Sequence, residues 1–218
     1  MDTKNKILKT AIKLFSEKGF DGTSVSNIAE ECGVNKPLIY YYFENKDGLL
    51  NHILDDILTE AEKETVIILK EEKMRLIEQG EISFEGDKLK ILDMSEEEIK
   101  KSMEYTLVRI INFYLKRKDI LKVLLTESIK KNDRSYLMFK IVEVLNGENV
   151  SKTMKDNNLE MFFDKIALTE RFFLGLMPII TFSIYYDEWC KYHNIECEEI
   201  KEMFMDRFMS CMGQNFLK

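Results

Sequence analysis

Residues 25–43 read VSNIAEECGVNKPLIYYYF, and this stretch carries the most specific structural pattern in the chain. Two short helical patterns are separated by the three-residue turn Gly33-Val34-Asn35. Gly33 suits such a turn because a residue without a Cβ adopts positive φ at low cost. Ala29 is small enough for the second helix to cross close above it. The apolar positions that can form a shared core are Ile28, Cys32, Val34 and Ile39. The second helix then projects an outer face, and such a helix fits a DNA major groove.

The sequence on either side predicts further helices. Residues 3–18 place their apolar side chains on one face, and Asn45 opens a helix that could run to about Gln79. Ser95 and Glu98 form a capping box for the next helix. The later helical patterns cover about 95–117, 119–131, 133–146, 159–192 and 197–216, whereas 80–93 is predicted to be a loop. With only 2 Pro and 9 Gly, the chain is expected to be all-α, with about nine helices.

Composition and charge narrow the possible functions. Hydrophobic residues make up 45% of the 218-residue chain, which is enough for a sizeable core. The net charge is −7, and residues 1–52 hold seven lysines and seven acids, so that segment is neutral. A neutral segment is a weak electrostatic footprint for a nucleic-acid binder. The DNA-binding hypothesis therefore depends on the residue pattern and not on charge.

The expected cellular compartment follows from three features that the sequence lacks: a signal peptide, a membrane-spanning run and a disulfide scaffold. The first ten residues alternate in charge and lack the apolar run of a signal peptide. The uncharged run 172–186 is shorter than the roughly 17–25 residues of a spanning helix, and Pro178 interrupts it. Four Cys are too few for a secreted disulfide scaffold. We expect a cytoplasmic protein that is not associated with a membrane.

The N-terminal pattern resembles the TetR (tetracycline repressor) family. The matching positions run from Ile7 to Leu50 and include LF-x3-GF-x2-TSV-x2-IA-x2-CGV-x4-IYYYF-x-NKDGLL. The resemblance covers about the first quarter of the chain, and the rest agrees in being helical and of the usual length. One departure is Pro37, where many members carry Gly or another small residue. The resemblance implies a three-helix DNA-binding domain at 1–46, and an effector-binding and dimerisation domain at 47–218.

The resemblance also implies a homodimer that binds double-stranded operator DNA through the helix at about 36–42. Ser24 and Thr23 start the preceding helix, where hydroxyls or amides would meet phosphate. Further phosphate contacts are expected from Asn35, Lys36, Tyr40, Tyr42 and Lys46. Contacts with base edges, mainly thymine methyls, are expected from Pro37, Leu38 and Tyr41.

A small apolar effector is expected to bind the C-terminal domain, because methionines and aromatic rings suit such a ligand. The candidate residues are Met103, Tyr105, Phe113, Tyr136, Phe139, Phe162, Phe163, Glu170, Phe173 and Met177. For each of them, packing in an ordinary core is an equally good interpretation. Glu104, Glu127 or Glu170 could attract a lipophilic cation if buried, although a solvated helix face is the commoner place for a glutamate.

The last two long helices are expected to form the interface between subunits. The residues predicted to be buried there are Phe172, Leu176, Ile180, Ile184, Phe204, Phe208 and Met212. Cys190, His193 and Cys197 form a nearby cluster of soft ligands or a thiol pair, but their spacing matches no strong metal motif. We therefore predict no metal and no cofactor, with this cluster as a weak candidate.

The predicted function is a ligand-responsive transcriptional repressor. We find no nucleophile elbow, no Gly-rich phosphate loop and no paired catalytic histidines, so no catalytic residue is predicted and an enzyme is not expected. Two alternatives stay open: a regulator switched by metal or thiol oxidation, and a helical interaction protein that does not bind DNA.

Overall fold

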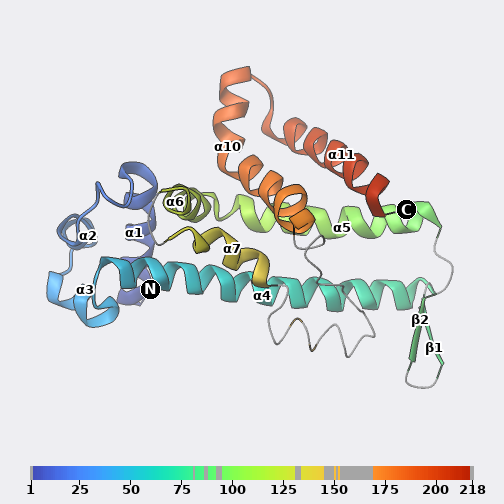
Figure 1. Cartoon of the computed structure of the whole chain (residues 1–218), viewed down its shortest axis with the longest axis horizontal. Helices are drawn as coiled ribbons and strands as arrows, with labels where there is room; N and C mark the ends of the chain where they lie inside the picture. Colours follow the sequence, from blue (N-terminus) through green and yellow to red (C-terminus); the bar gives the residue numbers. More distant parts are fainter. Residues whose placement is uncertain are drawn as a thin grey trace. The chain divides into compact units, whose positions relative to one another are not determined.

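The computed structural model of the protein describes residues 2–80, 82–85, 88–91, 95–130, 134–144, 150, 152 and 169–216. Within these ranges the chain is helical apart from one small hairpin (Figure 1). The helices are α1 Thr3–Lys18, α2 Val25–Cys32, α3 Lys36–Phe43, α4 Lys46–Glu78, α5 Glu96–Leu115, α6 Lys118–Ser128, α7 Tyr136–Glu143, η2 Arg171–Leu176, α10 Met177–His193 and α11 Cys197–Phe216. The predicted all-α class is confirmed.

The chain forms two compact units. The N-terminal unit holds residues 1–61 together with 117–144, and the C-terminal unit holds 62–116 together with 145–218. The predicted division at 46/47 differs from these units, because α6 packs against α1 and α7 packs against α6. The long helix α4 is continuous across the boundary at residue 61.

The N-terminal unit is built on an apolar core. One face of α1 is buried, as its spacing predicts, and the start of α4 contributes a second buried face. Its most deeply buried side chains include Ile7, Phe43, Leu49, Leu50, Ile53, Leu54, Leu121 and Leu124. Burial of a leucine- or isoleucine-sized side chain stabilises a fold by about 1.5–3 kcal/mol.

In the C-terminal unit, α5 packs against both α10 and α11. Ile111 on α5 and Ile180 on α10 are fully buried. The two last helices also meet through a stacked ring pair, with the centroids of Phe182 and Phe204 4.0 Å apart. This unit therefore depends on apolar and aromatic packing.

Two segments differ from the predicted secondary structure. Residues 80–93 were expected to be a loop, but strands β1 Ile82–Glu85 and β2 Lys88–Ile91 pair there as an antiparallel hairpin, with Ile82 opposite Ile91. The prediction was wrong because the alternation in this short, lysine-rich stretch is weak. The predicted helix 159–192 is described only from residue 169, and its part from Arg171 to Leu176 is a π-helix. Across the parts of the chain that the structure describes, no helix has the length and apolar character needed to span a membrane.

Candidate nucleic-acid interface

Side-chain caps set the ends of α2 and α3. The Ser24 hydroxyl accepts from the Asn27 amide, and the Asn27 side chain accepts in return from the Ser24 amide, at 3.1 and 3.0 Å. The Asn35 side chain accepts from the Leu38 amide at 3.0 Å. Between the helices Gly33 is left-handed, with φ 67° and ψ 37°. These are the caps and the turn that the sequence predicts.

The inner faces of α2 and α3 are buried, and α2 packs against both α1 and α3. Ile28, Ala29, Cys32, Ile39 and Phe43 are all buried, while Val34 in the turn is only partly buried. Lys6 on α1 donates to the Cys32 carbonyl oxygen at 2.6 Å, which ties the end of α2 to α1. The packing fixes which face of α3 remains outside.

The outer face of α3 carries Lys36, Pro37, Tyr40 and Tyr41, all of them exposed. Tyr41 is 79% exposed, so most of its ring is open to a partner. Leu38 and Tyr42 are partly buried at the edges of this face, and the rings of Tyr41 and Tyr42 meet edge to face at 5.3 Å. We call the four exposed residues the α3 face. Ser24 and Asn35 are also exposed, at the N-termini of α2 and α3.

Thr23 differs from its prediction as a phosphate contact. Its side chain is 1% exposed, and the hydroxyl lies 2.9 Å from the Gly19 carbonyl oxygen and 3.1 Å from that of Leu14. Its amide donates to the Phe20 carbonyl oxygen at 3.2 Å. Both polar groups are therefore used to close the loop between α1 and α2. The structure gives Thr23 an internal role in place of the predicted one.

Lys46, at the start of α4, holds the same loop. Its ammonium group donates to the carbonyl oxygens of Phe20 and Thr23, at 3.0 and 3.1 Å, and lies 4.2 Å from the centre of the Phe20 ring. An ammonium group has three N–H donors. Two of them are used within the chain, which leaves one for the predicted phosphate contact.

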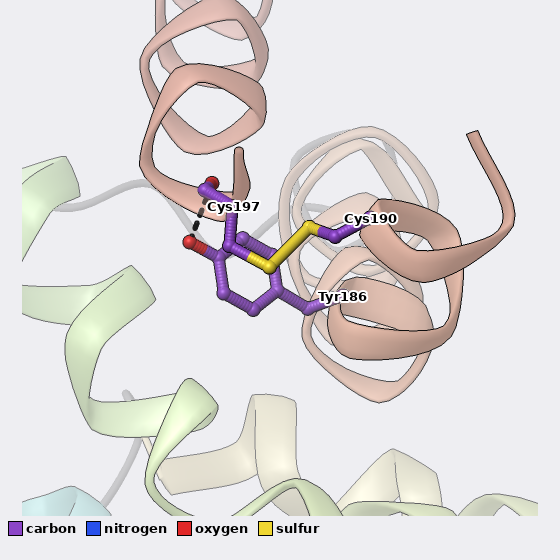
Figure 2. The surroundings of a disulfide bond; sticks show 3 residues. All are labelled: Tyr186, Cys190 and Cys197. Carbon is purple, nitrogen blue, oxygen red and sulfur yellow. Dashed lines mark hydrogen bonds between the residues drawn. A yellow bond between two sulfur atoms is a disulfide. The ribbon is translucent and has the colours of Figure 1, made fainter. Parts of the chain in front are cut away.

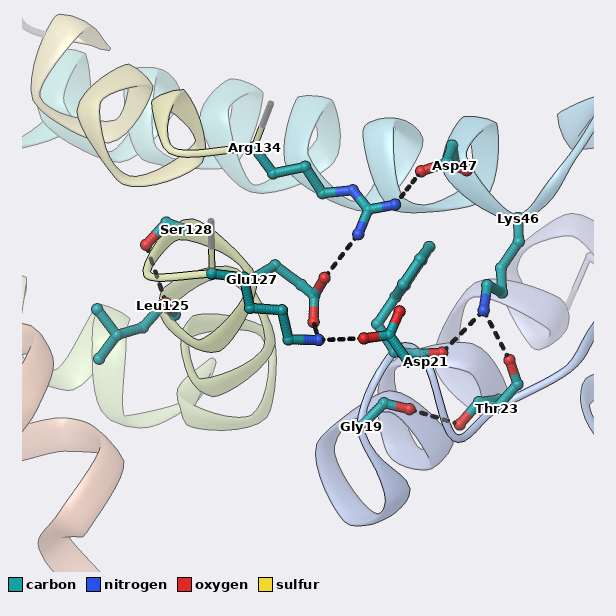
Figure 3. A network of polar contacts seen from close by, with 11 residues as sticks. Gly19, Asp21, Thr23, Lys46, Asp47, Leu125, Glu127, Ser128 and Arg134 are labelled. Atoms are coloured by element: carbon teal, nitrogen blue, oxygen red, sulfur yellow. Dashed lines mark hydrogen bonds and ion pairs between the residues drawn. The ribbon is translucent and has the colours of Figure 1, made fainter. Parts of the chain in front are cut away.

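A buried carboxylate organises the polar contacts of this unit (Figure 3). Glu127 on α6 is 1% exposed and is paired with both Lys130 and Arg134. Lys130 also pairs with Asp21 at 2.7 Å, and Arg134 also pairs with Asp47. We call these five residues the Glu127 cluster. It joins the α6–α7 segment to the α1–α2 loop and to the first turn of α4.

The electrostatics of the Glu127 cluster follow from these contacts. The hydrogen bond from Lys130 and its positive charge lower the pKa of the Asp21 carboxyl. The hydrogen bonds to Asp21 and Glu127 raise the pKa of Lys130. Glu127 is also a predicted candidate for attracting a lipophilic cation, but in the structure it is paired with Lys130 and Arg134 of its own chain. Lys130 and Arg134 lie three and seven positions after Glu127 in the sequence, beyond the end of α6 at Ser128.

The predicted effector residues are divided between the two units. Tyr136 and Phe139 lie on α7 in the N-terminal unit and are exposed. Phe113 in the C-terminal unit is buried, and Met103 and Met177 are partly buried, whereas Phe173 and Glu170 are exposed. Phe162 and Phe163 lie outside the described residues. The structure therefore does not bring the whole set together in one compact unit.

Tyr105 belongs to a polar set between α4 and α5 and not to an apolar one. Its hydroxyl donates to Glu71 at 2.8 Å, and the neighbouring Arg109 pairs with Glu64 at 2.8 Å and also with Glu71. These contacts raise the pKa of both Tyr105 and Arg109. Glu104 is paired with Lys100 on the surface of α5.

The predicted interface residues on α10 point into their own subunit. Ile180 is 0% exposed, and Ile184 is also buried within the chain, so neither can gain burial from a second subunit. Phe204 and Phe208 are partly buried and stack on each other at 5.7 Å, and Phe172 and Leu176 are also partly buried. The Met212 side chain lies outside the described residues. The exposed rings on α10 are those of Tyr185, Trp189 and Tyr192, which we call the α10 stripe.

The cysteine pair near the α10–α11 turn forms a disulfide. Cys190 and Cys197 are bonded, with their Cα atoms 5.4 Å apart (Figure 2). His193 stacks on Trp189 with ring centroids 4.4 Å apart. Among the described residues, no group of three or more His, Cys, Asp or Glu is placed to hold a metal ion. The thiol interpretation of this cluster is thus the one that the structure favours.

Two short helices, a left-handed turn and an exposed face on the second helix define a helix-turn-helix DNA-binding domain. Residues 7–53 match the model of the bacterial regulatory proteins of the tetR family. This N-terminal segment is therefore similar to the DNA-binding segment of TetR-family regulators. Members of this family are DNA-binding regulators and not enzymes.

Similar proteins share this N-terminal segment. The probable HTH-type regulator YttP of Bacillus subtilis (strain 168) is 46% identical over 56 residues, which are 26% of this chain and 27% of YttP. The biofilm operon icaADBC negative transcriptional regulator IcaR of Staphylococcus epidermidis is 46% identical over 46 residues, which are 21% of this chain and 25% of IcaR. The matched segment thus spans about a quarter of these relatives.

Solved structures resemble the chain over most of its length. A TetR-family regulator from Bordetella parapertussis 12822 has a TM-score of 0.56 at 16% identity, over 94% of this chain and 93% of that one. The TetR-family regulator PfmR from Thermus thermophilus has a TM-score of 0.54 at 17% identity, over 96% of both chains. At this level of identity the likeness shows the fold alone.

Proposed function

We propose that the chain is a homodimeric transcriptional repressor that binds a two-fold symmetric operator through α3. The observation that carries this is the α3 face, where Lys36, Tyr40 and Tyr41 are exposed on a helix whose other side is buried. Lys36 and Tyr40 would contact phosphates, and the Tyr41 ring would supply an apolar contact to a thymine methyl. Repression is favoured because IcaR, which shares the DNA-binding segment, is named a negative regulator. Because its partner would be chromosomal DNA, the proposal places the protein in the cytoplasm.

The α10 stripe supports a second copy of the chain as a partner. Tyr185, Trp189 and Tyr192 follow one another at spacings of four and three, so they share one face of α10. Aromatic residues are enriched in the core of protein–protein interfaces. A symmetric dimer would also supply the two α3 helices that a palindromic site requires. Sedimentation of the full chain at micromolar concentration tests this, and a monomer would contradict it.

A small apolar effector remains our proposal for the signal. Its support is the C-terminal unit, where Phe113 and Met103 lie on α5, and Met177 lies where the π-helix η2 meets α10. Single π-helical turns within helices are often found at functional sites. Because α4 begins at Lys46 beside the DNA-binding helices and ends in the C-terminal unit, a tilt of α4 would move α3. A 100-fold difference in effector affinity would supply about 2.7 kcal/mol of coupling.

The deciding experiment is a gel shift of the full chain with the DNA upstream of its own gene, followed by footprinting. We expect two protected half-sites whose centres lie about one helical turn, or a multiple of it, apart. A single unrepeated half-site would contradict the symmetric dimer. An absence of binding would favour the helical interaction protein.

Lys36→Ala sharpens this test, with Lys122→Ala on α6 as the control because both lysines are exposed. Loss of one phosphate contact would weaken binding to all sequences alike and reduce the slope of log affinity against log salt by about one. A change in base preference would show that Lys36 has a different role.

The apolar effector has its own test. Once a compound that raises the melting temperature is found, its affinity is measured with and without operator DNA. Linkage requires operator DNA to weaken effector binding by the same factor by which effector weakens operator binding. Equal affinities would leave DNA binding intact and rule out ligand release as the switch.

A further inference from the structure

The Cys190–Cys197 pair sits where α10 ends and α11 begins, seven residues apart in sequence. The Cα separation of 5.4 Å lies within the roughly 4.4–6.8 Å that disulfides usually span. Cys190 is 5% exposed and Cys197 is partly exposed. The two other cysteines, Cys32 and Cys211, are free.

Other contacts hold the two cysteines close without help from the bond between them. Asn194 is left-handed, and the amides of Asn194 and Ile195 both donate to the Cys190 carbonyl oxygen. The Tyr186 hydroxyl donates to the Cys197 carbonyl oxygen at 2.6 Å, as Figure 2 shows. The turn between the helices is therefore built by backbone caps and by a tyrosine. After reduction, the two thiols would stay within reach of each other.

We propose that Cys190 and Cys197 form a reversible dithiol–disulfide site, which a hydroperoxide oxidises and a small dithiol or a dithiol protein reduces. This goes beyond the proposed function, because the input is an oxidant and not an apolar effector. Preorganisation is the physical reason: a pair already in contact closes faster than the same thiols react with other partners. The product ties the last turn of α10 to the first turn of α11.

The reaction balances in two steps. The Cys197 thiolate, the more exposed of the two, attacks one peroxide oxygen; the O–O bond breaks, and the leaving hydroxide takes a proton to give water. The Cys190 thiolate then attacks the Cys197 sulfur; the S–S bond forms, the S–O bond breaks, and a second water leaves. Overall, two thiols are oxidised by two electrons and one hydrogen peroxide is reduced to two waters. Reduction by a dithiol reverses the change through a mixed disulfide.

The test uses the full chain, fully reduced and freed of reductant, and titrated with hydrogen peroxide. Trypsin cleaves after Lys191, between the two cysteines, so the disulfide would link peptide 172–191 to peptide 192–201. We expect this linked pair to appear first, with two of the four thiols lost for each peroxide consumed. Dithiothreitol should return both peptides to their free form.

Two controls separate this site from a general reaction of exposed thiols. Cys211→Ser removes the exposed free cysteine and should leave the formation of the linked peptides unchanged. Cys197→Ser should abolish the linked peptides and leave Cys190, which is buried, largely unmodified. The single tryptophan, Trp189, precedes Cys190, so its fluorescence can follow oxidation in the intact protein.

Three outcomes would overturn the proposal. Cys211 could be oxidised first while Cys190 and Cys197 stay reduced. The bond could resist excess dithiothreitol in the folded chain, which would make it a permanent structural disulfide. Alternatively, peroxide could add oxygen to Cys197 without forming the linked peptides. The gel shift is independent of all three, so failure here and failure of the proposed DNA binding are distinguishable.

Discussion

The α3 face and the α10 stripe both expose aromatic rings, but their charged neighbours differ. Tyr41 on α3 is 79% exposed and Tyr192 on α10 is 85% exposed. The sequence of α3, KPLIYYYF, has one lysine and no acid. The acids around the α10 stripe are Asp187, Glu188, Glu196, Glu198 and Glu199. A phosphate backbone would be repelled from the second surface and not from the first. Local charge, and not the aromatic residues themselves, separates a surface suited to DNA from one suited to protein.

The residues that support the two surfaces also differ in kind: those behind the α3 face are charged, and those behind the α10 stripe are apolar. Behind α3, the loop before α2 and the start of α4 are held by the charged groups of the Glu127 cluster. Behind the α10 stripe lie the apolar side chains of Ile180 and Ile184. Substitution of charged residues in the Glu127 cluster should therefore affect the α3 face and leave the α10 stripe unchanged.

The largest effect is expected from Glu127→Ala, which removes the buried anion and leaves Lys130 and Arg134 without their shared partner. Breaking a buried ion pair costs about 3–5 kcal/mol, and we expect about 2–3 kcal/mol here because both cations are partly solvated. Urea unfolding of the full chain measures this change, with the exposed Glu143→Ala as the control. Equal stability of the two variants would show that the Glu127 cluster contributes little.

Tyr41→Asp should have the next largest effect, on operator affinity. The substitution removes an apolar contact with a base edge and places a carboxylate beside phosphates, so affinity should fall about 100-fold. Fluorescence anisotropy with labelled operator measures it. Ile129→Asp is the matched control, since Ile129 is an exposed apolar residue of the same unit. A similar loss of operator affinity in both variants would mean that the α3 face does not contact the operator specifically.

The double substitution Tyr185→Glu and Tyr192→Glu tests the α10 stripe. Central interface residues commonly contribute about 2 kcal/mol or more, which corresponds to a roughly 30-fold weaker association of subunits. Sedimentation velocity over a dilution series measures the association. Tyr136→Glu, an exposed tyrosine on α7, serves as the control. An unchanged dimer would place the interface elsewhere.

The smallest effect on stability is expected when the pH is lowered far enough to protonate the Asp21 carboxylate. Because the pKa of Asp21 is lowered in the folded chain, its contribution is complete above the carboxyl's ordinary pKa of about 4 and is lost as the pH falls through the lower folded value. Lys130→Met removes the cause and should return this pKa toward its ordinary value. An NMR titration of the Asp21 side chain in both proteins measures the shift. An unchanged pKa would show that Lys130 does not pair with Asp21 in solution.

Sequence alone predicted the helices of the N-terminal unit closely, because local signals mark their ends. Ser24 and Asn35 cap α2 and α3, Gly33 makes the turn, and α1 begins and ends at the predicted residues. The same local pattern fixed which side of α3 is exposed. Thr23 was misplaced because a hydroxyl at a helix start suits an internal bond as well as a phosphate.

The C-terminal unit was harder to predict because α10 is apolar or aromatic on several sides. Its pattern does not tell the buried Ile180 from the exposed Tyr185, and only the packing of α5 and α11 decides between them. The Glu127 cluster joins residues about a hundred positions apart, such as Asp21 and Lys130. No local pattern contains such a pairing. The disulfide likewise depends on the geometry of a turn that spacing alone does not set.

The Glu127 cluster has a consequence for chimeric regulators, in which the DNA-binding segment of one protein is joined to the effector-binding domain of another. If residues 1–46 were replaced by the DNA-binding segment of another protein, Arg134 would keep Asp47, but Lys130 would face a foreign residue in place of Asp21. A donor segment would be compatible only if it carried an acid at position 21, together with this chain's own Asp47. The interchangeable part is therefore not the first quarter of the chain, but that quarter together with the α6–α7 segment beneath it.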